Sequence, residues 1–178
     1  GGLEHLAEEG WVPATIKHRE SKMKVKIRLK GAKEHWKDKD IWSFKVKIKG
    51  KKTLFGMKKF EFEAPKTRTF LNEWHWNQLL RYSGLIYLRY FFVELTVNGK
   101  PLPVYAIEEN FEKRMIENNQ LRDGPIFRAG LYPRTTLPAI HVYQYKERSQ
   151  EDIKFMKLTK LAESRIEALR QGELSFSK

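Results

Sequence analysis

Segments that alternate between apolar and charged residues dominate the first third of the chain. In residues 23–30 every second position is apolar, and the positions between them carry lysine or arginine. Residues 42–49 and 60–63 repeat this alternation, and residues 11–17 also have a strand-like pattern. Because successive side chains of a β-strand point to opposite faces, these segments predict half-buried strands with one apolar and one charged face.

Helical spacing appears in two later segments. In residues 69–82 large side chains recur every three or four positions, and Thr69 is the expected cap. Residues 149–171 show the same spacing, and Gly172 follows as the expected stop. A further short helix is expected at residues 3–9, near the amino end.

A tight turn is predicted at Asn98-Gly99, because Asn-Gly between two apolar runs is typical of a two-residue hairpin loop. The two runs are residues 87–96 and 102–107. Shorter strands are predicted at residues 126–128 and 140–146. The order of elements predicts an α+β fold, with an antiparallel sheet, one packed helix and a carboxy-terminal helix.

Composition adds a strong positive charge to this picture. The 178 residues include 35 Lys and Arg against 22 Asp and Glu, which gives a net charge of +13. This balance favours an anionic partner, such as a nucleotide, a nucleic acid, an acidic protein or a membrane surface. The chain has no cysteine, which excludes disulfides, thiolate nucleophiles and cysteine zinc sites. No apolar run has the roughly 18 residues of a membrane span.

Several short motifs follow one another along the chain. They are Val12-Pro13-Ala14, Ile27-Arg28-Leu29-Lys30-Gly31, Ser43-Phe44-Lys45-Val46-Lys47, Leu54-Phe55-Gly56-Met57-Lys58-Lys59, Phe92-Val93-Glu94-Leu95-Thr96-Val97-Asn98-Gly99 and Val104-Tyr105-Ala106-Ile107-Glu108-Glu109. In this order they resemble the CotH family of spore-coat and secreted proteins, which have an atypical, divergent kinase fold. The resemblance covers residues 11–128 and, more loosely, the final helix, and the Leu-Phe-Gly-Met-Lys-Lys motif is the most specific part of it.

The resemblance implies a kinase N-lobe that faces ATP. We therefore expect a single domain over residues 1–178, with a core at 11–128 and an appended irregular segment and helix. It further implies ATP and magnesium as cofactors of the full-length protein, a C-terminal lobe as partner, an acidic or Ser-rich protein substrate, and an extracellular, cell-surface or spore-associated location.

Two departures from the family pattern limit the expected activity. The family usually has Gly-Asn and small residues after the first basic strand, whereas this chain has Gly31-Ala32-Lys33. The catalytic-loop Asp and the Trp-Asp-Phe-Asp-like metal motif of the family do not occur in these residues. We expect no catalytic residue and no metal ligand here. The chain is then either cut before the second lobe or a degenerate relative, and is inactive alone.

The candidate nucleotide-binding residues are cationic strand residues and two glutamates. Phosphoryl transfer needs a strand lysine on the phosphates and a helix carboxylate that holds this lysine. The resemblance favours Lys45 or Lys47 as the lysine, with Glu73 as its partner. Arg28 and Lys30, on the first basic strand, would be further phosphate contacts. Glu109, which closes the hairpin, would mark the hinge that contacts adenine through the backbone.

A different interpretation explains the same residues without a nucleotide. The lysines then only solubilise one side of a sheet, Arg28 lies on an exposed edge, and Glu109 ends a strand in solvent. As an alternative function, the lysine faces and exposed aromatic residues form a basic binding or structural module for an anionic partner, either an acidic protein or a nucleic acid.

Overall fold

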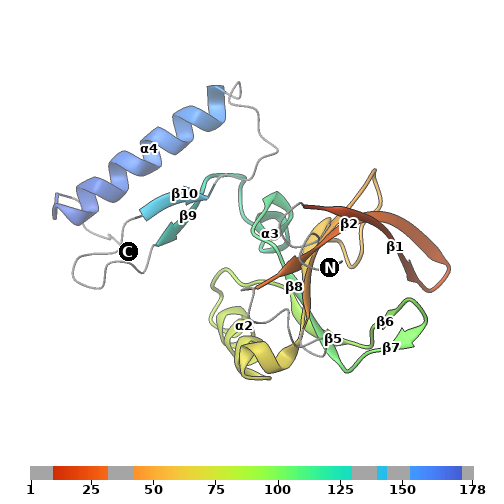
Figure 1. The fold of residues 1–178 in the computed structure, drawn as a ribbon. Helices are drawn as coiled ribbons and strands as arrows, with labels where there is room; N and C mark the ends of the chain where they lie inside the picture. The colour runs from red at the N-terminus through yellow and green to blue at the C-terminus, as the bar shows by residue number, and fades with distance from the viewer. Residues whose placement is uncertain (1–9, 32–41, 130–139, 144–152, 174–178) are drawn as a thin grey trace. The chain divides into compact units, whose positions relative to one another are not determined.

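The computed structural model describes residues 10–31, 42–129, 140–143 and 153–173 (Figure 1). The chain divides into two compact units, Gly1–Leu121 and Arg122–Lys178, so the first unit ends inside the core expected at 11–128. The helix expected at 3–9 lies outside the described residues, and so does the start of the helix expected at 149–171.

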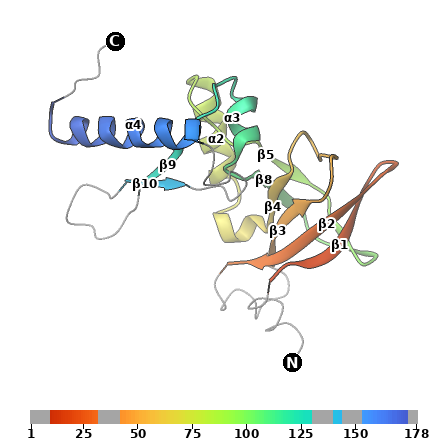
Figure 2. The same ribbon diagram turned by 90° about the horizontal axis from the view of Figure 1, so that it is seen from above.

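The first unit is built on an antiparallel sheet of six described strands, in the order β1-β2-β3-β4-β8-β5. The predicted strands are confirmed, and the first four of them follow one another as a meander. The β1–β2 hairpin extends beyond the rest of the sheet (Figure 2). The strands are β1 (Val12–His18), β2 (Ser21–Lys30), β3 (Ser43–Ile48), β4 (Lys59–Glu63), β5 (Tyr90–Val93) and β8 (Tyr105–Glu109).

Between β4 and β5 the chain forms a 3-10 turn, η3 (Pro65–Arg68), and then helix α2 (Asn72–Tyr82). The prediction that the helix begins at Thr69 is wrong. Thr69 and Phe70 have φ angles of 51° and 58°, in the left-handed region, so neither residue can belong to a right-handed helix. A second short helix, α3 (Lys113–Asn118), follows β8.

The Asn-Gly turn is confirmed as the loop between β6 (Thr96–Val97) and β7 (Lys100–Pro101). Asn98 and Gly99 have φ angles of 51° and 79°, and two positive φ angles are what a type I′ turn requires. The two predicted runs are shorter than expected as strands. The run 87–96 contains β5 and the first residue of β6, whereas the run 102–107 contains only the start of β8, because β7 precedes it. Strands β5 and β8 lie in the large sheet, and β6 and β7 form a separate hairpin.

The hydrophobic core lies against one face of the large sheet. Alternate residues of β2, β3, β4 and β8 face it, and the turn between β3 and β4 adds Leu54 and Met57. These two residues form a backbone bridge around Phe55 and Gly56, both with positive φ, so the Leu-Phe-Gly-Met motif is a tight turn packed on the core. Buried core residues include Val25, Val46, Phe60, Tyr105 and Ile107.

The second unit contains an antiparallel pair, β9 (Ile126–Ala129) and β10 (Ile140–Tyr143), and the helix α4 (Ile153–Arg170). The strands predicted near 126 and 140 are confirmed, as is the long carboxy-terminal helix over its described part. No described residue of α4 is buried. Among the described helices, none combines the length and the apolar character that crossing a bilayer requires. The fold is therefore α+β, as predicted.

Candidate functional site

A row of charged residues crosses the sheet on the face opposite to the core. The strand register pairs Arg28 with Lys45, Lys45 with Glu61, Glu61 with Glu108, and Glu108 with Tyr90. Residues paired across neighbouring strands point to the same face, so these five side chains share it. Strands β2, β3, β4, β8 and β5 each contribute one of them.

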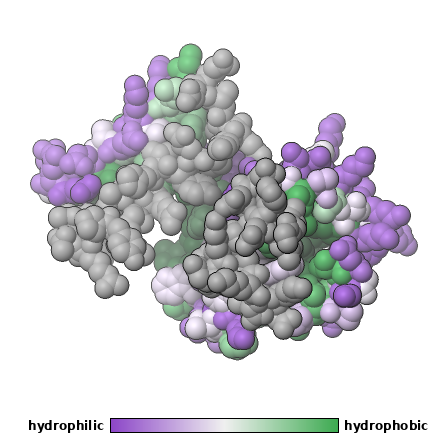
Figure 3. Space-filling view, viewed as in Figure 1, coloured by the Kyte–Doolittle hydropathy of each residue, from purple (hydrophilic) through white to green (hydrophobic). Residues whose placement is uncertain are grey.

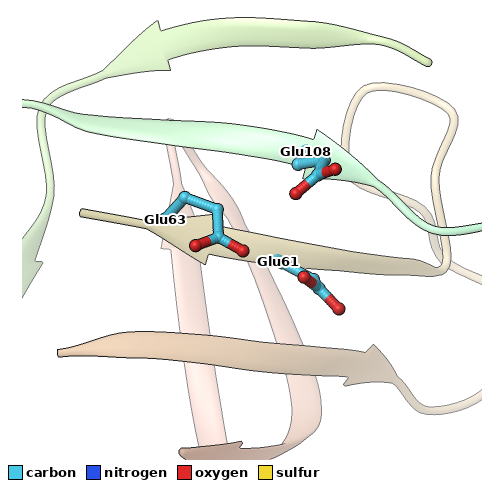
Figure 4. Close-up of side chains that lie close together, drawn as sticks. All are labelled: Glu61, Glu63 and Glu108. Carbon is cyan, nitrogen blue, oxygen red and sulfur yellow. The ribbon is translucent and has the colours of Figure 1, made fainter. Parts of the chain in front are cut away.

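Lys30, at the end of β2, lies among three carboxylates of this face. Its ammonium group forms ion pairs with Glu61 and Glu63, and its Nζ atom is 3.5 Å from Oε2 of Glu108. We call these four residues the charged cluster. Glu61 and Glu63 are buried although they are acidic. Figure 4 shows the two glutamates on one strand and Glu108 on the next, with the three side chains close together.

Burial and attraction compete within the charged cluster. Burial tends to lower the pKa of Lys30, but attraction by Glu61 and Glu63 outweighs it, and the pKa is raised. Burial tends to raise the pKa of Glu61, but Lys30 outweighs it, and that pKa is lowered. For Glu63 burial prevails, with repulsion from Glu61 adding to it, and the pKa is raised. Lys30 therefore stays charged, and Glu61 is the carboxylate that balances it.

Glu108 is the least satisfied carboxylate of the cluster. Burial, together with repulsion from Glu61 and Glu63, raises its pKa to about 7 against the attraction of Lys30. Its Oε2 atom accepts no hydrogen bond in the described structure, and the buried hydroxyl of Tyr90 beside it also has no hydrogen-bond partner there. Burial and the nearby Glu108 raise the pKa of Tyr90 to about 12. Tyr90 is therefore a neutral hydroxyl at ordinary pH.

The three carboxylates of the cluster have oxygens within 4.8 Å of one another, a spacing that suits a metal ion. Three cationic side chains already face them. Lys30 lies among them, Lys45 is 3.2 Å from Glu61, and Arg68 is 4.0 Å from Glu63. Because these cations balance the carboxylates, we assign no metal to the cluster.

The carboxylate next to Lys45 is Glu61 of β4. Glu73, the expected partner on the helix, is 3.5 Å from Arg68, which also approaches Glu63. Within the described residues, the structure thus brings Lys45 to a strand carboxylate and Glu73 to an arginine. Whether Glu73 serves a nucleotide stays a prediction.

Lys47 and Arg28 lie against one aromatic ring. The Nζ atom of Lys47 is 4.2 Å from the ring centre of Trp11, and the Cζ atom of Arg28 is 5.1 Å from it. In register, Lys47 lies between Lys26 and Lys59, so three lysines form a row over β2, β3 and β4. Hydrophilic residues also gather over the projecting β1–β2 hairpin (Figure 3).

Glu109 points to the other face of the sheet. Its side chain is buried and accepts hydrogen bonds from Nε of Arg89 (2.9 Å), from a terminal guanidinium nitrogen of Arg89, and from the Arg89 backbone amide (3.1 Å). The Glu109 amide donates to the Arg89 carbonyl oxygen, 3.0 Å away. Its side chain therefore braces the sheet and is apart from the charged cluster.

Sequence reasoning did not select the acidic members of the cluster. Glu61 and Glu63 alternate with Phe60 and Phe62, which is the same signal that placed the lysines of the earlier strands on a charged face. The missing information was the strand order, which brings β8 next to β4 and so adds Glu108.

Comparison with protein-family models finds no match for the chain, and comparison with curated proteins finds none either.

Proposed function

We propose that residues 11–128 form the nucleotide-facing lobe of a CotH-like protein kinase. The ordered motifs support this proposal, and so does an antiparallel sheet with a helix between two of its strands. The lobe would be inactive alone, because the catalytic and metal-binding Asp motifs of the family do not occur in its sequence. ATP and magnesium would act in the full-length protein together with a C-terminal lobe.

The observation that carries the proposal is the ion pair between Lys45 and Glu61. Glu61 is buried, while 30% of the Lys45 side chain is exposed, so a fixed carboxylate orients a lysine that is partly open to solvent. Arg28 lies next to Lys45 in register and is exposed. An oriented lysine with a second cation beside it is the arrangement that holds phosphates in phosphoryl transfer, which depends mainly on positioning and charge neutralisation.

Titration of the chain with ATP and magnesium, followed by amide NMR signals, tests the proposal. We expect weak saturable binding that shifts signals of β2 and β3, and that Lys45→Met abolishes. Lys51→Met removes the same charge from an exposed turn and is the matched control, which should bind as the unaltered chain does. Unchanged signals on β2 and β3 would contradict the nucleotide site. Tight binding with turnover would contradict an inactive lobe.

The lysine row favours a second candidate function, a basic module that binds a phosphate-bearing polyanion. Lys26, Lys47 and Lys59 are side by side on neighbouring strands, so their charges add to a positive surface that attracts a polyanion. Binding of single-stranded nucleic acid would then weaken with salt. For each tenfold rise in salt concentration, the logarithm of the association constant would fall by about 0.7 per phosphate neutralised. A flat salt dependence would exclude this candidate.

A further inference from the structure

An apolar pocket lies where β4 runs into η3 and where β8 begins, apart from the charged cluster. Its volume is about 560 Å³, within the range of sites that take small organic molecules. It is open to solvent on one side, and its lining is almost entirely apolar. The described lining residues are Ala64, Pro65, Lys66, Phe70, Leu71, Phe92, Pro103, Val104 and Tyr105.

The pocket has a buried floor and an exposed apolar rim. Ala64 and Tyr105 are buried, whereas Phe70, Leu71 and Val104 keep 61%, 48% and 53% of their surface exposed. Such large exposed apolar side chains around one hollow mark a binding surface more often than isolated ones do. A ligand that entered the pocket would remove this surface from water, which is the main driving force for binding an apolar molecule.

The backbone holds Phe70 at the rim in an unfavourable conformation. Thr69 and Phe70 are consecutive residues with positive φ, and each costs about 1 kcal/mol or more for a residue other than glycine. The amide of Phe70 donates to the carbonyl oxygen of Pro65 (2.9 Å), and Asn72 donates to the hydroxyl of Thr69 (2.9 Å). These hydrogen bonds fix the turn, so the rim is formed before any ligand arrives.

Polar groups of the pocket wall are already engaged. The hydroxyl of Tyr105 donates to the carbonyl oxygen of Trp42 (2.7 Å), and the carbonyl oxygen of Ala64 accepts from the amide and hydroxyl of Thr67. Lys66 is the charged residue of the described lining, is exposed, and forms no ion pair with any residue that the structure describes. The pocket therefore offers an apolar interior and one cation.

We propose that this pocket binds a small monoanionic amphiphile, a molecule with an apolar body and one carboxylate. The body fills the space between Phe70, Leu71 and Val104, and the carboxylate pairs with Lys66. Charge complementarity selects an anion over a neutral or cationic analogue. This inference is independent of the proposed nucleotide lobe, because it shares no residue with the charged cluster.

Calorimetric titration with dodecanoate, below its micelle concentration, tests the proposal. We expect one saturable site, with 1-dodecanol and dodecylamine binding more weakly. Leu71→Glu should weaken dodecanoate binding by at least about tenfold, because it puts a carboxylate beside the ligand and removes apolar surface. Leu79→Glu alters a residue that is 54% exposed and lies outside the pocket lining, so it is the matched control and should bind as the unaltered chain does.

The charge of Lys66 is tested separately. Lys66→Met should weaken dodecanoate binding by about two- to fivefold and leave 1-dodecanol binding unchanged, because a partly exposed ion pair contributes about 0.5–1 kcal/mol. Lys51→Met controls for net charge. Thermal unfolding of each variant establishes that it is folded. Equal binding of dodecanoate and dodecylamine would overturn the proposal, and so would equal losses in Leu71→Glu and Leu79→Glu. Binding only of aromatic or aliphatic peptides would assign the pocket to a protein partner instead.

Discussion

Arg89, which is partly buried, and Glu109, which is fully buried, form an ion pair that connects the edge of the sheet to the Leu-Phe-Gly-Met turn. Arg89 donates to both carboxylate oxygens of Glu109, and its second terminal nitrogen donates to the carbonyl oxygen of Phe55 at 2.9 Å. Glu109 and Phe55 are far apart in sequence, so one guanidinium group joins β8, the start of β5 and the β3–β4 turn.

Removing one partner of this pair should be costly. Glu109→Gln leaves the Arg89 charge partly buried without its counterion, so we expect the free energy of unfolding to fall by about 3 kcal/mol. Urea unfolding measures it. Glu117→Gln breaks the exposed Lys113–Glu117 pair of α3 and should cost less than about 0.5 kcal/mol. The double variant Arg89→Met/Glu109→Gln should recover part of the loss, and an additive loss would contradict the coupling.

Gly56 should tolerate substitution less well than Gly50. Both have positive φ, 78° and 72°, but a Cβ atom at Gly56 would lie 2.7 Å from a guanidinium nitrogen of Arg89, whereas one at Gly50 meets nothing within 4 Å. Gly50→Ala should cost about 1 kcal/mol from its backbone conformation alone. Gly56→Ala should cost about 1 kcal/mol more, because Arg89 must move. Equal melting temperatures of the two variants would contradict this prediction, because Arg89 would then move away from the new Cβ atom without a loss of stability.

Glu108 should make the protein less stable as pH rises. Its pKa is about 7 in the folded chain and 4.5 for an ordinary glutamate, so the folded state binds the extra proton between these values. Stability from this group is therefore present below pH 4.5 and is lost as pH rises through 7. Glu108→Gln has no proton to lose, so it should gain about 2–3 kcal/mol relative to the unaltered chain between pH 4.5 and pH 8. Urea unfolding at both pH values measures this gain. The same difference at both values would contradict the assignment.

Near neutral pH, Lys30→Met should lower the free energy of unfolding, whereas Glu108→Gln should raise it. It removes the cation that lies among Glu61, Glu63 and Glu108, and leaves carboxylates facing one another in a buried place. We expect a loss of about 3–5 kcal/mol at pH 7, and a smaller loss at pH 4, where carboxyl groups take up protons. Lys24→Met, on the exposed part of β2, should change stability by less than about 0.5 kcal/mol. A pH-independent loss would contradict a charge-based role for Lys30.

The strands could be predicted from sequence because alternation is a local signal. The alternation in residues 23–30 predicts both the strand and the residues on each of its faces, and the structure confirms this prediction. The start of α2 could not be predicted in this way. Thr69 looks like a cap, but its hydroxyl accepts from Asn72 within a left-handed turn that only the surrounding structure stabilises.

On the charged face, the neighbours of each side chain depend on strand pairing, which the local sequence does not reveal. Lys45 could be chosen from its position on a charged strand face, but its neighbour Glu61 depends on the register of β3 with β4. For Glu109 a local signal was available. Tyr105, Ile107 and Glu109 alternate along β8, so Glu109 shares the apolar face and Glu108 takes the charged one. The resemblance selected Glu109 as a marker of the hinge, which stays a prediction, and it did not select Glu108 for the charged face.

The Val12-Pro13-Ala14 motif has a consequence for encounters between chains. It lies in β1, the outermost strand of the large sheet, and the other outer strand, β5, has only four residues. Pro13 is exposed and has no N–H group to offer an approaching strand, and Lys17 adds charge to the same margin. The edge strand of a second folded copy therefore could not form a continuous series of backbone hydrogen bonds with β1. The β1 edge thus disfavours association of folded copies through strand pairing.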